Sequence, residues 1–287
     1  MTDFIFRLFF RTLSFLPLCV LHGMGALLGR MTYAFSPGYA ARIRENLLQA
    51  GYALDDEPGK RLLSKSIAEA GKGIMELPWI WGRSYEKVLG KVIECRGKEY
   101  FDAAQKAGSV IYLTPHFGCF ELAGLYCAQH RPVMILYRQP RLAWLEAVMC
   151  KGRGRGKAQL AKADLSGVRL LYKALKKGEA IGLLPDQVPG GGEGVWADFF
   201  GRPAYTMTLV GRLAEASNAT LLLVSAERKA KGYVMHFEPL PLDYSQPVAE
   251  QINKALEKII RDCPAQYLWS YNRYKVPAGV EPPKRDA

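Results

Sequence analysis

The stretch 109–124 most constrains the fold, because it combines a strand pattern, a sharp stop and the start of a helix. Val110–Leu113 is an apolar run of the length and residue type expected of a buried strand. Pro115 ends that strand, since proline has no backbone N–H and restricts the residue before it. An apolar helical pattern follows from Phe120. The stretch therefore predicts an α/β fold whose loop lies at the sheet edge where such folds bind ligands.

The same stretch carries a candidate acid–base pair, His116 and Glu121. A carboxylate can accept a hydrogen bond from one imidazole nitrogen, which leaves the other nitrogen to take a proton from a substrate hydroxyl. The spacing alone is a weak signal, because a chain with four histidines and 27 acidic residues contains such pairs by chance. Its position between a strand and a helix favours catalysis. Cys119 is interpreted as a small buried apolar residue rather than a nucleophile.

The charge and the cysteines limit the classes of partner and of fold. A formal net charge of +12 indicates an anionic partner, which can be nucleic acid, lipid headgroups or an acidic carrier protein. A hydrophobic content of 49% excludes a disordered chain. The six cysteines lack the spacing of a zinc site or a disulfide framework, which fits a reducing compartment.

The N-terminal segment 4–35 is apolar almost throughout. Its charge-free part, 12–29, has the minimum length for a membrane span. One interpretation is therefore a membrane-spanning helix whose flanking positive charges lie on the cytoplasmic side. It lacks the cleavage site of a secretory signal. An interfacial anchor, with Arg7 and Arg11 reaching lipid phosphates, fits its proline and glycine interruptions best. We therefore expect an apolar membrane-anchoring helix over 1–35, followed by a domain over 36–287.

The rest of the chain alternates between strand and helix patterns, with no internal repeat and no linker. It predicts a single globular domain with a central mixed β-sheet flanked by helices. The tryptophans of 77–81 belong either at a membrane interface or between the anchor and the domain. The expected strands are 92–95, 110–113, 132–137, 179–184, 220–226 and 233–238, and the expected helices are 39–50, 59–75, 98–107, 120–129, 142–150, 164–177, 205–217 and 248–263.

Two further segments carry charged side chains of interest. In Lys151–Lys157 four cations alternate with three glycines, a pattern that suits either a phosphate or carboxylate site or a mobile solvated loop. It lacks the ending of a phosphate-binding P-loop. Asp186 comes just after the strand 179–184. It is either an acid at the ligand-binding edge of the sheet or a carboxylate that caps a turn.

Taken together, these segments resemble one enzyme family over nearly the whole chain. His116-Phe-Gly-Cys-Phe-Glu121 is similar to the His-x4-Asp/Glu motif of glycerolipid-type acyltransferases. Further markers narrow the resemblance to the late acyltransferases of lipid A biosynthesis. These markers are Arg44-Glu-Asn-Leu, Lys151-Gly-Arg-Gly-Arg155, Leu184-Pro-Asp-Gln187, Asp198-Phe-Phe-Gly201 and Pro264-Ala-Gln-Tyr-Leu-Trp269.

The resemblance implies an inner-membrane enzyme, with its catalytic domain on the cytoplasmic face, that moves a fatty acyl chain from acyl carrier protein to a Kdo-bearing lipid A precursor. It makes His116 the general base and Glu121 its orienting partner. Gly152, Arg153 and Asp186 are expected to bind substrate. Acyl carrier protein is the co-substrate, inner-membrane lipids are further partners, and no cofactor, metal or nucleic acid is expected.

One segment departs from the family pattern. Trp269 is followed by Ser-Tyr-Asn-Arg-Tyr-Lys, where many members have His, a basic residue, Arg, Phe and Lys. This difference bears on acyl length or acceptor. Two alternatives to this function stay open: an acyltransferase for another lipid, such as a phosphatidylinositol mannoside or an ornithine lipid, and a non-catalytic basic protein that binds anionic lipid or nucleic acid.

Overall fold

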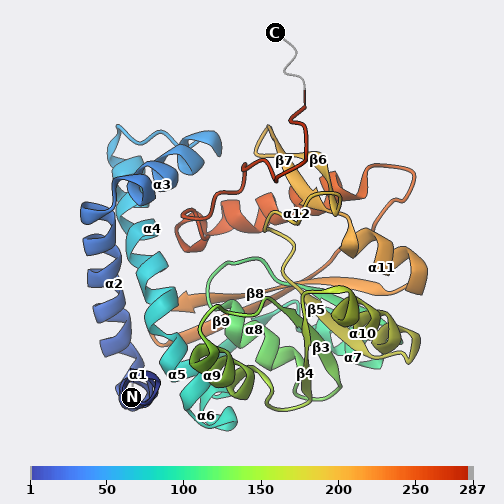
Figure 1. Cartoon of the computed structure of the whole chain (residues 1–287), viewed down its shortest axis with the longest axis horizontal. Helices are drawn as coiled ribbons and strands as arrows, with labels where there is room; N and C mark the ends of the chain where they lie inside the picture. The colour runs from blue at the N-terminus through green and yellow to red at the C-terminus, as the bar shows by residue number, and fades with distance from the viewer. Residues whose placement is uncertain (1, 284–287) are drawn as a thin grey trace.

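A mixed sheet of seven strands forms the centre of the protein, in the order β1-β9-β8-β2-β5-β3-β4, and β6 and β7 form a separate antiparallel pair (Figure 1). The computed structural model describes residues 2–283, so Met1 and the C-terminal 284–287 of the expected ranges lie outside it. The strands are β1 (Val92–Arg96), β2 (Val110–Leu113), β3 (Val133–Tyr137), β4 (Ala158–Lys162), β5 (Ala180–Leu183), β6 (Gly194–Phe199), β7 (Arg202–Met207), β8 (Thr220–Lys229) and β9 (Gly232–Pro239).

Helices cover both faces of this sheet. They are α1 (Thr2–Ser14), α2 (Leu18–Phe35), α3 (Pro37–Gln49), α4 (Glu57–Met75), α5 (Leu77–Gly82), α6 (Tyr85–Leu89), α7 (Lys98–Lys106), α8 (Phe120–Cys127), α9 (Ala143–Arg153), α10 (Leu165–Lys176), α11 (Leu209–Ser217) and α12 (Val248–Asp262), with a short 3₁₀ turn at Pro264–Gln266. The predicted single α/β domain with a central mixed sheet is confirmed.

Strand β2 lies at the heart of the sheet and is buried on both faces. Ile111 and Leu113 join the core beneath α10, α11 and α12, whereas Val110 and Tyr112 join the core beneath α7 and α8. β2 pairs in parallel with both β5 and β8. Because parallel strands end at the same edge of a sheet, the loops after β2 and β5 come out side by side.

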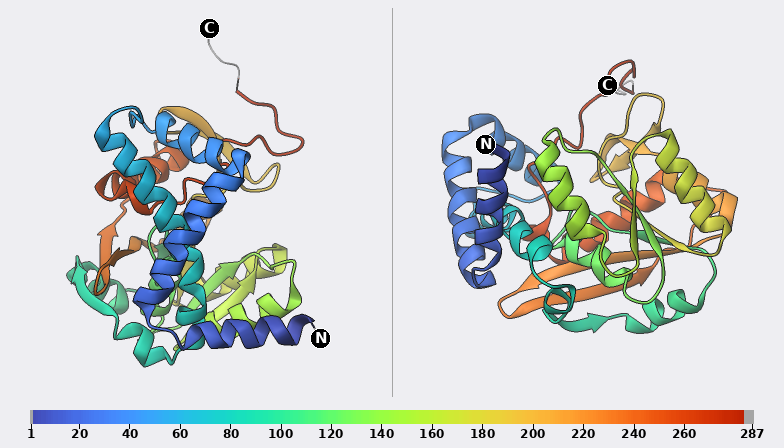
Figure 2. Two further views of the ribbon diagram at one scale, coloured as in Figure 1. Left: turned by 90° about the vertical axis from the view of Figure 1, so that its left-hand side faces the viewer. Right: turned by 60° about the horizontal axis from the view of Figure 1, so that its bottom comes forward.

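The expected single apolar anchoring helix over 1–35 is wrong, because the described part of this segment forms two helices, α1 and α2. Pro17 lies at the break, where its missing N–H cannot join a helical hydrogen bond. Within residues 2–283 no helix is both long enough and apolar enough to span a membrane. Leu13 and Leu21 turn into the protein core instead. Figure 2 shows α1 and α2 along one side of the molecule.

Glycines allow α2 and α4 to pack with their backbones in contact. An ideal Cβ on Gly29 would lie 2.2 Å from the carbonyl oxygen of Ile67, and one on Gly71 would lie 1.9 Å from that of Gly25. Such distances leave no room for a side chain. The small residues of α2 therefore attach it to the rest of the protein, and most of its larger apolar side chains face outward.

Gly29→Ala is expected to lower the free energy of unfolding by about 1–3 kcal/mol, because the added methyl forces α2 away from α4. Gly23→Ala is the matched control on the same helix, since nothing lies within 4 Å of its ideal Cβ. Alanine there is expected to be neutral or to stabilise by up to about 1 kcal/mol. Denaturant unfolding in detergent measures both variants, and equal effects would contradict the close packing.

The structure adds three strands that the sequence patterns did not predict, β4, β6 and β7. β4 follows the basic, glycine-rich segment and is a short edge strand with polar positions, so its apolar signal is weak. β6 and β7 form a hairpin over a segment that was expected to be loop and helix. The expected helix over 205–217 begins only at Leu209.

Candidate active site

The loop that carries His116 is fixed by backbone hydrogen bonds to two parts of the chain, the segment 266–268 and strand β8. The His116 carbonyl accepts from the N–H of Leu268 (3.0 Å), and the Gly118 N–H donates to the Gln266 carbonyl (3.0 Å). Gly118 has a φ of +55°, and a Cβ there would lie 2.0 Å from the Ala226 carbonyl oxygen. Only glycine fits this position without strain. The loop is therefore a rigid support for the imidazole.

Asp186 holds His116 at two points. Its Oδ1 lies 2.8 Å from His116 Nδ1, and its Oδ2 accepts the backbone N–H of His116 at 2.8 Å. Because an ionised carboxylate can only accept hydrogen bonds, Nδ1 carries the proton and Nε2 presents its lone pair. Gln187 Nε2 lies 3.2 Å from that atom and is placed to donate to it. His116 thus has the tautomer that a general base needs.

The charge state of Asp186 agrees with this arrangement. Its side chain is 2% exposed, and burial by itself would raise the pKa of the carboxyl. The charge of protonated His116 and the two hydrogen bonds from it outweigh burial and lower that pKa. Tyr267 lies beside the pair, and burial together with the Asp186 charge raises the pKa of its phenol. Asp186 is therefore ionised at neutral pH and Tyr267 is neutral.

Glu121 does not hold His116, and the expectation that it orients the imidazole is corrected by its contacts. Its Oε2 accepts Nε–H of Arg153 at 2.8 Å, and its Oε1 accepts Nη2–H of the same guanidinium. Trp81 donates its indole N–H to Oε2 at 2.9 Å. Glu121 lies in the first turn of α8, whose direction turns its carboxylate toward α9. Asp186 takes the orienting position instead.

Arg153 ends α9 and lies against Glu121 in a two-point ion pair. Burial opposes its charge, but the Glu121 carboxylate outweighs burial and raises the pKa of the guanidinium. Gly152, one residue earlier, is buried, and an ideal Cβ there would lie 2.4 Å from Trp81 Cβ. The visible role of Gly152 is close packing, and its contact with substrate stays a prediction.

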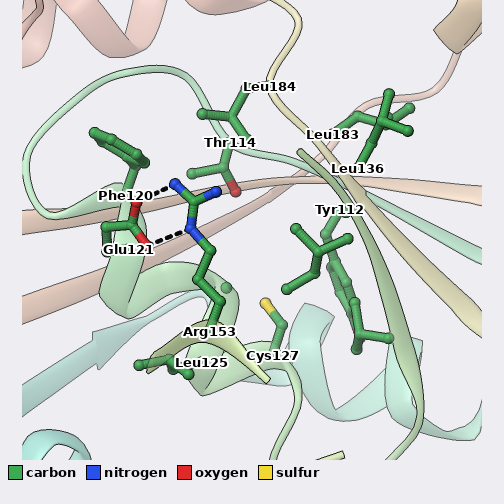
Figure 3. Close-up of a pocket in the computed structure, with 14 residues that line it drawn as sticks. Tyr112, Thr114, Phe120, Glu121, Leu125, Cys127, Leu136, Arg153, Leu183 and Leu184 are labelled. Carbon is green, nitrogen blue, oxygen red and sulfur yellow. Dashed lines mark hydrogen bonds and ion pairs between the residues drawn. The ribbon is translucent and has the colours of Figure 1, made fainter. Parts of the chain in front are cut away.

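A narrow cavity lies between α8 and the ends of β2, β3 and β5 (Figure 3). Arg153 and Glu121 lie on one side of it, and most of the other walls are apolar. Its volume of about 40 Å³ is far below the roughly 150 Å³ of a cavity that holds a benzene ring, so a fatty chain enters only if side chains move. The lining residues are Tyr112, Thr114, Phe120, Glu121, Gly124, Leu125, Cys127, Val133, Ile135, Leu136, Arg153, Gly182, Leu183 and Leu184.

The structure thus brings all five predicted site residues to one edge of the sheet in two groups: His116 with Asp186, and Glu121 with Arg153 and the adjacent Gly152. The tryptophans of 77–81 were expected at a membrane interface or between the N-terminal segment and the domain, and Trp81 does stack on Phe10 of α1. Its contact with Glu121 was not predicted, because the two residues lie 40 positions apart. Among residues 2–283 no three His, Cys, Asp or Glu side chains lie together as ligands of a metal ion.

Comparison with known proteins shows which family the chain belongs to. Residues 1–276 match the model of the bacterial lipid A biosynthesis acyltransferases. The chain belongs to this family. It is 31% identical to the lipid A biosynthesis lauroyltransferase of Escherichia coli (strain K12), over 92% of this chain and 89% of that protein. It is 30% identical to the palmitoleoyltransferase of the same strain, over 91% and 86%.

Membership of the family makes this protein an acyltransferase of lipid A biosynthesis. Among solved structures, a 1-acyl-sn-glycerophosphate acyltransferase from Thermotoga maritima matches at 14% identity with a TM-score of 0.36. That match covers 77% of this chain and 96% of the other.

Proposed function

We propose that the enzyme transfers a fatty acyl chain from acyl carrier protein to the hydroxyl of a 3-hydroxyacyl chain on a Kdo-bearing lipid A precursor. The observation that carries the proposal is the His116–Asp186 pair, with Nε2 as an oriented acceptor in a chain of this family. A lipid hydroxyl has a high pKa, so a positioned base accelerates its attack by a factor of about 10² to 10⁴.

The proposed reaction needs no covalent acyl-enzyme. The acceptor oxygen attacks the thioester carbon while His116 Nε2 takes the hydroxyl proton. The C–O bond forms, the C–S bond breaks, and the carrier thiolate leaves and regains a proton from His116. Arg153 Nη1 donates no hydrogen bond within residues 2–283, so we propose that it contacts the developing oxyanion or a phosphate of the acceptor.

The outward surface of α1 and α2 supports a location at the cytoplasmic face of the inner membrane. Phe9, Phe15, Leu27 and Phe35 are between 59% and 82% exposed. Exposed arginines accompany them on α1. In our proposal the apolar side chains enter the lipid interface, the arginines bind lipid phosphates, and the two helices, which lie along one side of the molecule, rest on the membrane (Figure 2). The charge of +12 suits an acidic carrier and a phosphorylated acceptor.

An acceptor competition tests the proposal. Purified enzyme in mixed micelles receives one acyl carrier protein thioester together with the Kdo-bearing precursor, an ornithine lipid and a phosphatidylinositol mannoside. Mass spectrometry is expected to find one added acyl chain on the lipid A precursor alone. Preferential acylation of either other lipid would overturn the acceptor assignment. Salt-sensitive lipid binding with no transfer to any acceptor would instead support a non-catalytic basic protein.

A further inference from the structure

Trp81 connects the N-terminal helix to the ion pair at the active site. Its indole N–H donates to Glu121 Oε2 at 2.9 Å, on the same oxygen that accepts Arg153 Nε–H at 2.8 Å. Three donors from two side chains therefore fix this carboxylate. Without the indole, Glu121 keeps its two-point contact with Arg153 but loses the donor that ties this pair to α5.

The indole itself is held on both sides. The ring of Phe10 in α1 stacks on it with centroids 5.9 Å apart and an angle of 24° between the planes. On α9, Gly152 leaves no space between its Cα and the Trp81 side chain. Arg155 locks α9 to the end of α5, because its guanidinium donates to the carbonyls of Gly152 (2.6 Å), Arg83 (2.6 Å) and Ile80 (2.5 Å). The Trp81 indole therefore lies packed between Phe10 of α1 and Gly152 of α9.

We propose that Trp81 is a positioning residue for acyl transfer: through Glu121 it sets the guanidinium of Arg153, and α1 supports it through Phe10. This inference rests on the proposed role of Arg153 in the transfer reaction. It explains why a glycine precedes Arg153, since any larger residue there would displace the indole. It also makes the docking of α1 a condition for a competent site, although α1 itself touches no reacting atom.

Trp81→Phe tests the proposal, because it keeps an aromatic ring for Phe10 and removes only the indole N–H and part of the ring. We expect the single-turnover rate constant of transfer to fall about 10-fold, the size expected for the loss of a hydrogen bond to a charged group. The amplitude of the turnover and the KM of the acyl donor are expected to stay unchanged. A merely structural defect would lower the amplitude, since fewer molecules would be folded.

Trp79→Phe is the matched control. Trp79 lies in the same helix and is 2% exposed, but its indole donates no hydrogen bond within the described residues. Its rate constant is expected to equal that of the wild type. The proposal is overturned if Trp81→Phe retains the wild-type rate constant, or if both variants lose rate equally.

Phe10→Leu provides a second test that does not alter the indole. It is also expected to lower the rate constant, by a smaller factor than Trp81→Phe does, because the ring that stacks on the indole is lost. If Trp81→Phe does not fold, a wild-type rate constant in Phe10→Leu overturns the proposal. Each rate constant is expressed relative to that of the wild type, measured on the acceptor that the wild type uses. The test therefore remains valid if that acceptor is not the proposed lipid A precursor.

Discussion

His116→Ala is expected to lower the rate of acyl transfer by a factor of about 10² to 10⁴, the usual contribution of a general base. The loss follows from the geometry, because the Asp186 contact holds the proton on Nδ1 and so leaves the lone pair on Nε2. Folding is expected to persist, since the loop is held by backbone bonds to Leu268, Gln266 and Ala226 that alanine retains. The measurement is single-turnover transfer with a radiolabelled acyl donor.

His130→Ala is the control for a general effect of losing a histidine. His130 is exposed, and its backbone carbonyl accepts a hydrogen bond from Lys157 Nζ. Alanine keeps that carbonyl, so transfer is expected to stay at the wild-type rate. A His116→Ala enzyme with wild-type activity would contradict the proposed base and move the chemistry to another residue.

Glu76→Gln is expected to destabilise the protein by about 3 kcal/mol, the lower end of the cost of breaking a buried ion pair, because Arg228 keeps a second carboxylate, Glu69, at 3.0 Å. Glu76 is 2% exposed, and its two oxygens accept from Arg228 Nε (2.8 Å) and Nη2 (2.6 Å). Tyr233 and His22 add hydrogen bonds to the same carboxylate. Arg228 Nη2 also donates to the Gly118 carbonyl at 2.5 Å, so the network supports the His116 loop as well.

Glu57→Gln is the matched control for this stability prediction. Its side chain is 74% exposed and pairs with Lys60 at 3.4 Å, so its loss is expected to cost less than about 1 kcal/mol. Chemical unfolding in detergent at pH 7 measures both variants. Equal small effects would mean that the buried network contributes nothing to stability.

The same network gives stability a defined pH dependence. Burial raises the pKa of Glu76, but Arg228 and the hydrogen bonds outweigh it and lower that pKa to about 2. The usual value of 4.5 applies to the unfolded chain, which binds the proton first as pH falls. The stabilisation is therefore complete above about pH 4.5 and is lost as pH falls toward 2. Glu76→Gln is expected to lose this part of the acid sensitivity, measured as unfolding free energy against pH.

The sequence predicted the elements whose signals are local. The strand Val110–Leu113 was predicted because a short apolar run that ends before Pro115 indicates a buried strand. The strand 179–184 was predicted for a similar reason. The prediction of one N-terminal anchoring helix was wrong because Pro17 divides the segment into two helices, and hydropathy does not reveal that Gly25 and Gly29 pack the second one against α4. Apolar composition alone does not distinguish a helix attached to a protein from one that spans a lipid bilayer.

The candidate site was predicted in its residues but not in its pairing. Spacing made Glu121 the partner of His116, whereas the strand order brings Asp186 there from β5, 70 positions along the chain. Glu121 in turn meets Arg153, 32 positions away. Both pairings follow from the parallel neighbours β2 and β5 and from the approach of α9 to α8, which local patterns do not encode.

Single-turnover transfer by Asp186→Asn and Glu121→Gln, each made in the wild type and in His116→Ala, tests the central claim most directly, which is that Asp186 orients His116 while Glu121 orients Arg153. Asp186 contacts the imidazole at Nδ1, so Asp186→Asn is expected to slow transfer in the wild type and to add little further loss in His116→Ala. Glu121 contacts the Arg153 guanidinium, so Glu121→Gln is expected to slow transfer by a similar factor in both backgrounds. A full further loss from Asp186→Asn in His116→Ala, together with no further loss from Glu121→Gln there, would contradict this assignment.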